Sequence, residues 1–208
     1  MAQPVQSEMI QFIGEESERI NRMLTNFLEF AKPKPPAFQE VDLKEVLDRT
    51  LDWISIPARK QRVEVRKEYP EGKVLIRVDP EQVREAVVNL EMNALEAMPG
   101  GGTLRISLSQ NEDRDVTIRL SDTGGGIPPG MENKIFDPFF TTKEGGTGLG
   151  LSIVHSVVKN HGGTIAVTSN NGEGTTFTLN LPYPKAVMGC FGPVGPVNDR
   201  GQGKGGKG

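Results

Sequence analysis

Two asparagines one helical turn apart could bind a metal ion. They stand in "DPEQVREAVVNLEMNALEAM" (79–98), which carries the start and stop signals of a helix. On a helical wheel, Glu85, Asn93 and Glu96 lie within about 40° of Asn89, and apolar residues gather on an adjoining face. Asparagine is a mediocre helix former, whereas amide oxygens are hard ligands that suit Mg²⁺ beside phosphates. The stripe therefore indicates either a metal–phosphate site or an ordinary solvated helix face.

Two glycine-rich stretches, "DTGGGIPPG" (122–130) and "GGTGLGLSIV" (145–154), suggest a second kind of chemistry. Asp122 ends an apolar strand pattern, and its carboxylate can accept a hydrogen bond from an amine such as adenine N6. The glycines after it let a flat ring approach. In the second stretch, alternate glycines precede an apolar helix, whose N-terminal N–H groups suit phosphates. The alternatives are an ordinary aspartate in a turn and a slack loop, and neither a Walker loop nor a GxGxxG spacing is present.

Helices and strands alternate in the part of the chain that must position these residues. The patterns predict helices at 42–61 (with Pro57 as a kink or end), 79–98 and 147–161, strands at 63–69 and 74–79, and hairpins at 103–122 and 164–182. This order predicts an α+β fold. We expect a two-layer α/β sandwich with a mixed, mostly antiparallel sheet covered by helices on one face.

The two ends of the chain differ from this middle part. Apolar residues at alternating steps of three and four predict a coiled-coil helix over 7–32, which "KPKPP" (32–36) ends. Residues 185–208 are rich in glycine and predict a disordered tail. The net charge of −3 does not suggest nucleic-acid binding, and the single Cys190 excludes a disulfide within the chain. With neither a long apolar run nor a leader in view, a cytoplasmic setting is expected.

Four stretches in order resemble the motifs of a known family. "NLEMNALEAM", "DTGGGIPP", "FDPFFTTK" and "GTGLGLSIV" resemble the N, G1, F and G2 boxes of the ATP-binding domain of bacterial sensor histidine kinases. That domain belongs to the superfamily shared with gyrase, heat-shock chaperone and mismatch-repair ATPases. The resemblance covers about residues 38–182, and residues 7–36 look like the second helix of the family's dimerisation and phosphoacceptor hairpin. It implies a partial hairpin helix and linker at 1–36, an ATP-binding catalytic domain at 37–184 and the tail at 185–208.

The resemblance also implies how a nucleotide would be held. Asp122 would recognise adenine, supported by Thr175 from the last hairpin, and the glycines would line the base pocket and close a lid over the phosphates. Phe136, Phe139 and Phe140 would be the packing anchors of that lid. Metal binding would fall to Asn93 with Asn89, and catalysis to Glu85, Asn89 and Lys143. The implied contacts of ATP are Asn89, Asn93, Asp122, Gly124, Gly126, Ile127, Phe136, Thr142, Lys143, Gly146, Thr147, Gly148, Leu149, Gly150 and Thr175.

The chain departs from the family in its phosphate acceptor. A histidine kinase carries its acceptor histidine on the first hairpin helix, and this chain contains only His155 and His161. The pattern around His155 favours a core or groove position, and His161 suits a cationic cap at a helix end. We therefore expect the catalytic part of a two-component kinase, truncated within or before its hairpin. Its expected partners are Mg-ATP, the acceptor hairpin of the parent kinase and a response regulator receiver domain.

Two other functions stay open beside the leading one. The first is a serine kinase of the anti-sigma-factor type, against which the heptad segment and its proline stop argue. The second is a non-enzymatic module that senses ATP, against which the presence of Glu85, Asn93 and Lys143 argues. The parent is expected to be a homodimer. This chain, with about three heptads and Ser17 in the seam, is expected to be a monomer or weak dimer.

Overall fold

The computed structural model describes residues 9, 14, 17, 35–143, 146–170 and 172–183. Most of the helix expected at 7–32 and the tail expected at 185–208 lie outside these residues, although Met9, Gly14 and Ser17 are each helical. The expected division into three parts stays a prediction. Within the described ranges, no helix is both long enough and apolar enough to cross a membrane.

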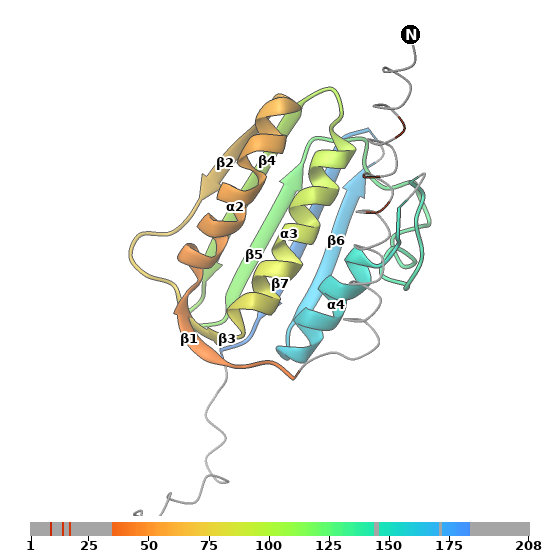
Figure 1. Ribbon diagram of the computed structural model, residues 1–208. Coiled ribbons are helices and arrows are strands. Elements are labelled where there is room, and N and C mark those ends of the chain that lie inside the picture. Colours follow the sequence, from red (N-terminus) through yellow and green to blue (C-terminus); the bar gives the residue numbers. More distant parts are fainter. Residues whose placement is uncertain are drawn as a thin grey trace, which may run out of the picture.

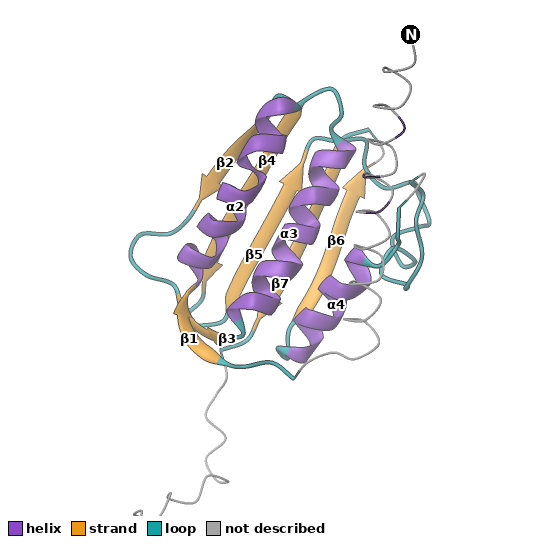
Figure 2. Ribbon diagram, in the orientation of Figure 1, coloured by secondary structure: helices purple, strands orange, loops and turns teal. Residues whose placement is uncertain are grey.

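A five-stranded sheet forms one layer, and three helices cover one of its faces (Figures 1 and 2). The strands lie in the order β2 (Val63–Glu68), β4 (Gly102–Gln110), β5 (Val116–Asp122), β7 (Gly174–Leu181) and β6 (Thr164–Asn170). Among the described strands of this sheet, β2 and β4 pair in parallel and the other pairs are antiparallel. The predicted mixed, mostly antiparallel α/β sandwich is therefore confirmed.

The covering layer consists of α2 (Leu43–Lys60), α3 (Pro80–Ala97) and α4 (Gly150–Asn160), with α3 in the middle (Figure 1). A short antiparallel pair, β1 (Gln39–Asp42) with β3 (Leu75–Val78), closes one end. The strand β1 was not predicted. Pro57 lies inside α2, which continues to Lys60, and α4 begins at Gly150 rather than at 147.

The helix α3, which carries the asparagine stripe, is fastened at its start. The Asp79 carboxylate accepts hydrogen bonds from the backbone N–H groups of Glu81 (3.0 Å) and Gln82 (3.1 Å), and Pro80 occupies the first turn. Val83, Val87 and other apolar residues of one face are buried against the sheet. This burial fixes the rotation of α3 and turns its polar stripe toward α4 and the loops that precede it.

One of the two histidines, His161, lies where it was expected, at the end of a helix. His155 is exposed and its ring lies 5.7 Å from that of Phe136, so a core position is wrong. His161 is buried at the end of α4, as a cap should be. Its Nδ1 lies 2.8 Å from the Val157 carbonyl oxygen, and its Nε2 accepts a hydrogen bond from the Asp79 backbone N–H. Both ring nitrogens of His161 are therefore in hydrogen bonds at the helix end.

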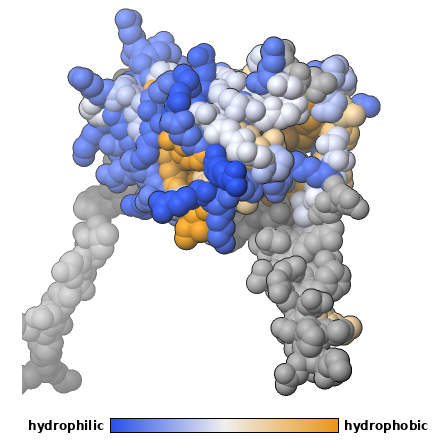
Figure 3. Space-filling view, turned by 90° about the horizontal axis from the view of Figure 1, so that it is seen from above, coloured by the Kyte–Doolittle hydropathy of each residue, from blue (hydrophilic) through white to orange (hydrophobic). Residues whose placement is uncertain are grey.

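The face in Figure 3 is mostly hydrophilic, with a group of apolar side chains (orange) between hydrophilic ones (blue). The large apolar side chains that are exposed among the described residues are Met9, Phe38, Trp53, Ile56 and Phe139. The uncovered face of the sheet is polar. In β5, for example, Arg119 is exposed on that face while Ile118 and Leu120 are buried on the other. One layer of helices therefore suffices to cover the apolar face.

A carboxyl group, Glu91, is completely buried between α3 and α2. Its Oε1 lies 2.7 Å from Thr50 Oγ1, which also lies 2.8 Å from the Leu47 carbonyl oxygen, and its Oε2 has no partner. The single hydroxyl proton of Thr50 can serve only one of these two oxygens. Both contacts are satisfied if Glu91 is protonated and donates to Thr50. Burial raises the pKa of the Glu91 carboxyl to about 8, although the hydrogen bond with Thr50 opposes this.

We expect Glu91 to make the stability of the fold depend on pH. Its folded pKa of about 8 exceeds the ordinary value of 4.5, so the folded state binds a proton more tightly and stability falls as pH rises between these values. Glu91→Gln keeps the size and shape of the side chain but removes the group that titrates. Its free energy of unfolding should exceed that of the unchanged chain by about 2–4 kcal/mol near pH 8.5 and match it near pH 4.5. Thermal unfolding at both pH values measures this, with the exposed Glu112→Gln as the control. A difference that does not vary with pH would contradict it.

Candidate functional site

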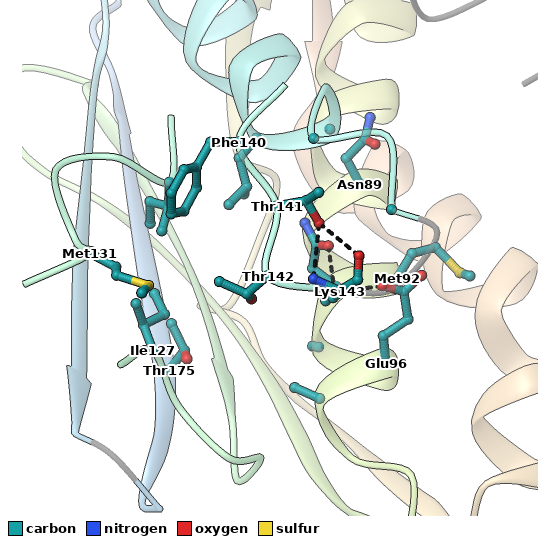
Figure 4. A pocket seen from close by; sticks show the side chains of 18 of the residues that line it. Asn89, Met92, Glu96, Ile127, Met131, Phe140, Thr141, Thr142, Lys143 and Thr175 are labelled. Atoms are coloured by element: carbon teal, nitrogen blue, oxygen red, sulfur yellow. Dashed lines mark hydrogen bonds and ion pairs between the residues drawn. The ribbon is translucent and has the colours of Figure 1, made fainter. Parts of the chain in front are cut away.

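A pocket of about 470 Å³ opens between α3, the segment that connects β5 to α4, and the ends of β5 and β7 (Figure 4). It has two different ends. In Figure 4, Ile127, Met131 and Phe140 lie on one side near Thr175, while Lys143 lies on the other against α3. One end therefore suits a flat apolar group, and the other suits a charged one.

Most of the residues singled out in the sequence line this one pocket. They are Asn89, Asn93, Asp122, Gly126, Ile127, Thr142, Lys143, Gly146, Thr147, Gly148, Gly150 and Thr175. They come from α3, β5, β7, the start of α4 and the connecting loops. The fold thus brings together residues that lie up to 86 positions apart, from Asn89 to Thr175.

Four residues expected at the site do not line the pocket. Gly124 packs on the end of α3, where an added Cβ would lie 2.7 Å from the Ala97 Cβ. Leu149 is buried in the core, and Phe136 packs on the ring of His155. Glu85 lies one turn before Asn89, and its backbone carbonyl accepts a hydrogen bond from Asn89 Nδ2 at 3.0 Å. Glu85 is therefore connected to the pocket by this hydrogen bond with Asn89, which lines it.

Other lining residues were not among the contacts implied for ATP. They are Met92, Ala94, Glu96, Ala97, Pro128, Met131, Ile135, Phe140, Thr141, Leu151 and Phe177. The helical wheel had already placed Glu96 in the asparagine stripe of α3, and Met92 lies beside that stripe on the same wheel. Met131 and Ile135 lie in an irregular segment without periodicity, so only the tertiary structure shows that they face the pocket.

The charged end of the pocket combines amide oxygens, a lysine and the start of a helix. Asn93 Oδ1 accepts a hydrogen bond from Lys143 Nζ at 3.1 Å, and Lys143 Nζ also pairs with Glu96 Oε2 at 2.5 Å. The first residue of α4, Gly150, lies so close to Asn89 that an added Cβ would be 3.0 Å from Asn89 Oδ1. No side chain caps α4 at Leu149, so its first N–H groups are available to an anion. This end can bind phosphates.

The residues at the charged end also suit a divalent cation. Asn89 uses its Nδ2 in the hydrogen bond to Glu85, which leaves its Oδ1 as the group turned toward Gly150. Asn93 already presents its oxygen to a cation, the Lys143 ammonium. Two neutral oxygens beside a phosphate site are a donor set that fits Mg²⁺, which binds through few protein ligands and takes the rest from phosphates and water.

The apolar end of the pocket holds one buried carboxylate. Asp122 is 8% exposed, and its Oδ1 accepts hydrogen bonds from the backbone N–H groups of Gly124 (2.8 Å) and Thr175 (3.3 Å). Oδ2 is left without a partner among the described residues. Burial raises the pKa of the Asp122 carboxyl, while the N–H groups of Gly124 and Thr175 and the charge of Lys143 oppose the rise. A fixed, buried acceptor of this kind can recognise an exocyclic amine.

The segment between the two glycine-rich stretches is hydrogen-bonded to the second of them. The Phe139 backbone N–H donates to the Gly148 carbonyl oxygen at 2.9 Å. Gly148 has φ +66°, and an added Cβ would lie 2.4 Å from the Phe139 carbonyl carbon, so only glycine fits there. Phe136 and Phe140 pack against the core as the expected anchors. Phe139 is 59% exposed, so its ring is not buried against the core as the other two are.

The family described as histidine kinase-, DNA gyrase B- and HSP90-like ATPases matches residues 78–185. The chain belongs to this family. It is 37% identical over 175 residues to sensor histidine kinase ZraS of Escherichia coli, covering 84% of this chain and 37% of ZraS. It is 36% identical over 171 residues to sporulation kinase A of Bacillus subtilis, covering 82% of this chain and 28% of that kinase. The chain therefore spans about a third of the length of these relatives.

Solved structures of histidine kinases share the fold. The nucleotide-free catalytic domain of histidine kinase ThkA is 30% identical with a TM-score of 0.64, covering 70% of this chain and 95% of that domain. ThkA in complex with the response regulator protein TrrA is 26% identical with a TM-score of 0.75, covering 88% of this chain and 53% of that one. The resemblance to sensor histidine kinases that the four motifs indicated is confirmed, because the relative ZraS and the solved ThkA domain are both histidine kinases.

Proposed function

We propose that this domain binds Mg-ATP as the catalytic part of a two-component sensor histidine kinase and transfers the γ-phosphate to a histidine of the dimerisation hairpin. The observation that carries the proposal is the pocket with two ends. One buried acceptor, Asp122, lies at the apolar end, and Asn93, Lys143 and the start of α4 lie at the other. A nucleotide has the same two ends, a flat base with an exocyclic amine and a charged polyphosphate.

At the apolar end, the chain would select adenine. Asp122 Oδ2 would accept a hydrogen bond from the exocyclic amine, because Oδ1 is already held by Gly124 and Thr175. Ile127 and Met131 would cover the faces of the ring, since both line this side of the pocket. The two backbone hydrogen bonds keep the carboxylate in one orientation, so no reorganisation is needed on binding.

At the charged end, the chain would position the phosphates for transfer. Asn93 and Asn89 would hold Mg²⁺, which, when bound, neutralises phosphate charge. Lys143 would contact a phosphate, and the first N–H groups of α4 would bind another. Phosphoryl transfer depends mainly on positioning and on charge stabilisation, which these groups can supply.

The acceptor must come from another segment. His155 is exposed on α4 and does not line the pocket, and His161 is buried with both ring nitrogens in hydrogen bonds. We propose that the acceptor is the hairpin of the parent kinase and that the phosphate then passes to the aspartate of a response regulator. The complex of the relative ThkA with the response regulator TrrA supports this second partner.

The test is binding followed by transfer. Purified chain is titrated with ATP in Mg²⁺ and in chelator, and then incubated with labelled ATP and the isolated acceptor hairpins of its relatives. We expect Mg²⁺-dependent binding and label on histidine, which is lost in acid and kept in base. Acid-stable label on serine would instead support the serine-kinase alternative, and binding without any transfer would support the ATP-sensing one. Absence of ATP binding would contradict the proposal.

A further inference from the structure

The side chain of Lys143 lies across the asparagine stripe of α3. Its Nζ contacts Asn93 Oδ1 at 3.1 Å and Glu96 Oε2 at 2.5 Å (Figure 4). Its backbone is held as well, because Lys143 N–H donates to Thr141 Oγ1 at 3.1 Å and Gly146 N–H donates to the Lys143 carbonyl oxygen at 3.1 Å. The ammonium group therefore has a defined place rather than a free range of positions.

This place conflicts with both roles of the charged end. The ammonium occupies Asn93 Oδ1, the oxygen that the proposed function assigns to Mg²⁺, and two cations on one oxygen repel each other. The ion pair with the Glu96 carboxylate also keeps the Lys143 ammonium from pairing with a phosphate. Binding of Mg-ATP must therefore move Lys143 off Asn93 and Glu96.

The presence of Glu96 itself needs an explanation. A carboxylate that lines a phosphate-binding pocket repels its ligand unless a cation neutralises it. Lys143 supplies that cation in the structure. The Glu96 side chain is 51% exposed, so water can solvate the carboxylate once Lys143 has left. The Glu96 carboxylate is thus neutralised by Lys143 before Mg-ATP binds and solvated by water afterwards. Its ion pair with Lys143 lowers the free energy of the nucleotide-free state.

The geometry points to Glu96 as a latch residue, which holds Lys143 over Asn93 while the pocket is empty and yields it to a phosphate when Mg-ATP binds. This inference rests on the proposed function and adds a positioning residue to it. Nucleotide affinity is reduced by the fraction of molecules in which the latch is closed. Glu96 therefore weakens binding through Lys143, although it contacts no part of the nucleotide.

The test is a double-mutant cycle on nucleotide affinity. An exposed ion pair is weak, so we expect Glu96→Gln to tighten Mg-ATP binding by about two- to fivefold. Lys143→Met should weaken binding, because the phosphate contact is lost. In the Lys143→Met background, Glu96→Gln should change affinity by less than about 1.5-fold, since no lysine remains to be held. Calorimetry on all four proteins gives the coupling.

A matched control is Glu81→Gln, which removes another exposed ion pair of α3, that with Arg84 at 2.7 Å, outside the pocket. It should leave affinity unchanged. A second readout needs no nucleotide: trypsin should cut after Lys143 faster in the Glu96→Gln protein than in the unchanged one, and equally fast in the control.

Three results would overturn the latch. An equal gain in the Lys143→Met background would show that Glu96 acts by repelling the nucleotide directly. A loss of affinity confined to Mg²⁺ conditions would show that Glu96 is a metal ligand. Unchanged affinity and unchanged proteolysis would show that the pair has no role. Failure of the unchanged chain to bind ATP at all would instead overturn the proposed function.

Discussion

Asn93→Ala is expected to reduce phosphoryl transfer to an acceptor hairpin by at least about 100-fold, the scale on which a positioned electrostatic group acts in a transition state. Asn93 Oδ1 is the amide oxygen that already faces a cation in the pocket, and alanine offers no oxygen in its place. The affinity for ATP should fall in Mg²⁺ and stay unchanged in chelator. Single-turnover transfer from labelled ATP and calorimetry under both conditions measure the two effects.

The fold of the Asn93→Ala protein should be intact. Asn93 lies in the interior of α3 and is only partly buried, and alanine is the better helix former, so the unfolding temperature should be equal or slightly higher. Asn160→Ala, at the exposed end of α4, is the matched control and should transfer phosphate normally. An Asn93→Ala protein that keeps Mg²⁺-dependent transfer would contradict the assignment of a metal ligand.

Asp122→Asn is expected to weaken ATP binding by about 10- to 100-fold, the value of a hydrogen bond to a charged acceptor. The asparagine Oδ1 can still accept from the N–H groups of Gly124 and Thr175. Those two bonds place the new Nδ2 where Oδ2 was, so a donor would then face the donating amine of adenine. Calorimetric titration with ATP measures the loss.

For the Asp122→Asn protein, the affinity for GTP is the control for the affinity for ATP. GTP presents an oxygen where ATP presents an amine, so the ratio of ATP to GTP affinity should fall in the Asp122→Asn protein. Stability should not fall, because the substitution removes a buried group whose pKa is raised mainly by desolvation. An unchanged ratio of affinities would count against recognition of the base by Asp122.

Local chemistry made parts of the fold predictable. The caps at Asp42 and Asp79, the alternation in β4 and β5, and the polar stripe of α3 each depend on residues within one or two turns of chain. The strand β1 was missed because its partner, β3, lies more than 30 residues away and no strong alternation marks it. The start of α4 was placed too early, because Thr147, Gly148 and Leu149 connect directly to an apolar helix. In the structure Gly148 bonds to Phe139 instead, and Leu149 is the N-cap of α4.

The sequence by itself determined the types of group at the site: two amides one turn apart, an aspartate at the end of a strand, and glycines before a helix. Their chemistry follows from residue type and short spacing, which need no tertiary contact. Only the tertiary structure decided which of them meet. Gly124 and Leu149 proved to serve packing, Met131 and Phe140 joined the lining, and Lys143 was set on Asn93 and Glu96 across about 50 positions. Such contacts depend on how α3, β7 and the connecting segment pack together, and no local pattern encodes that.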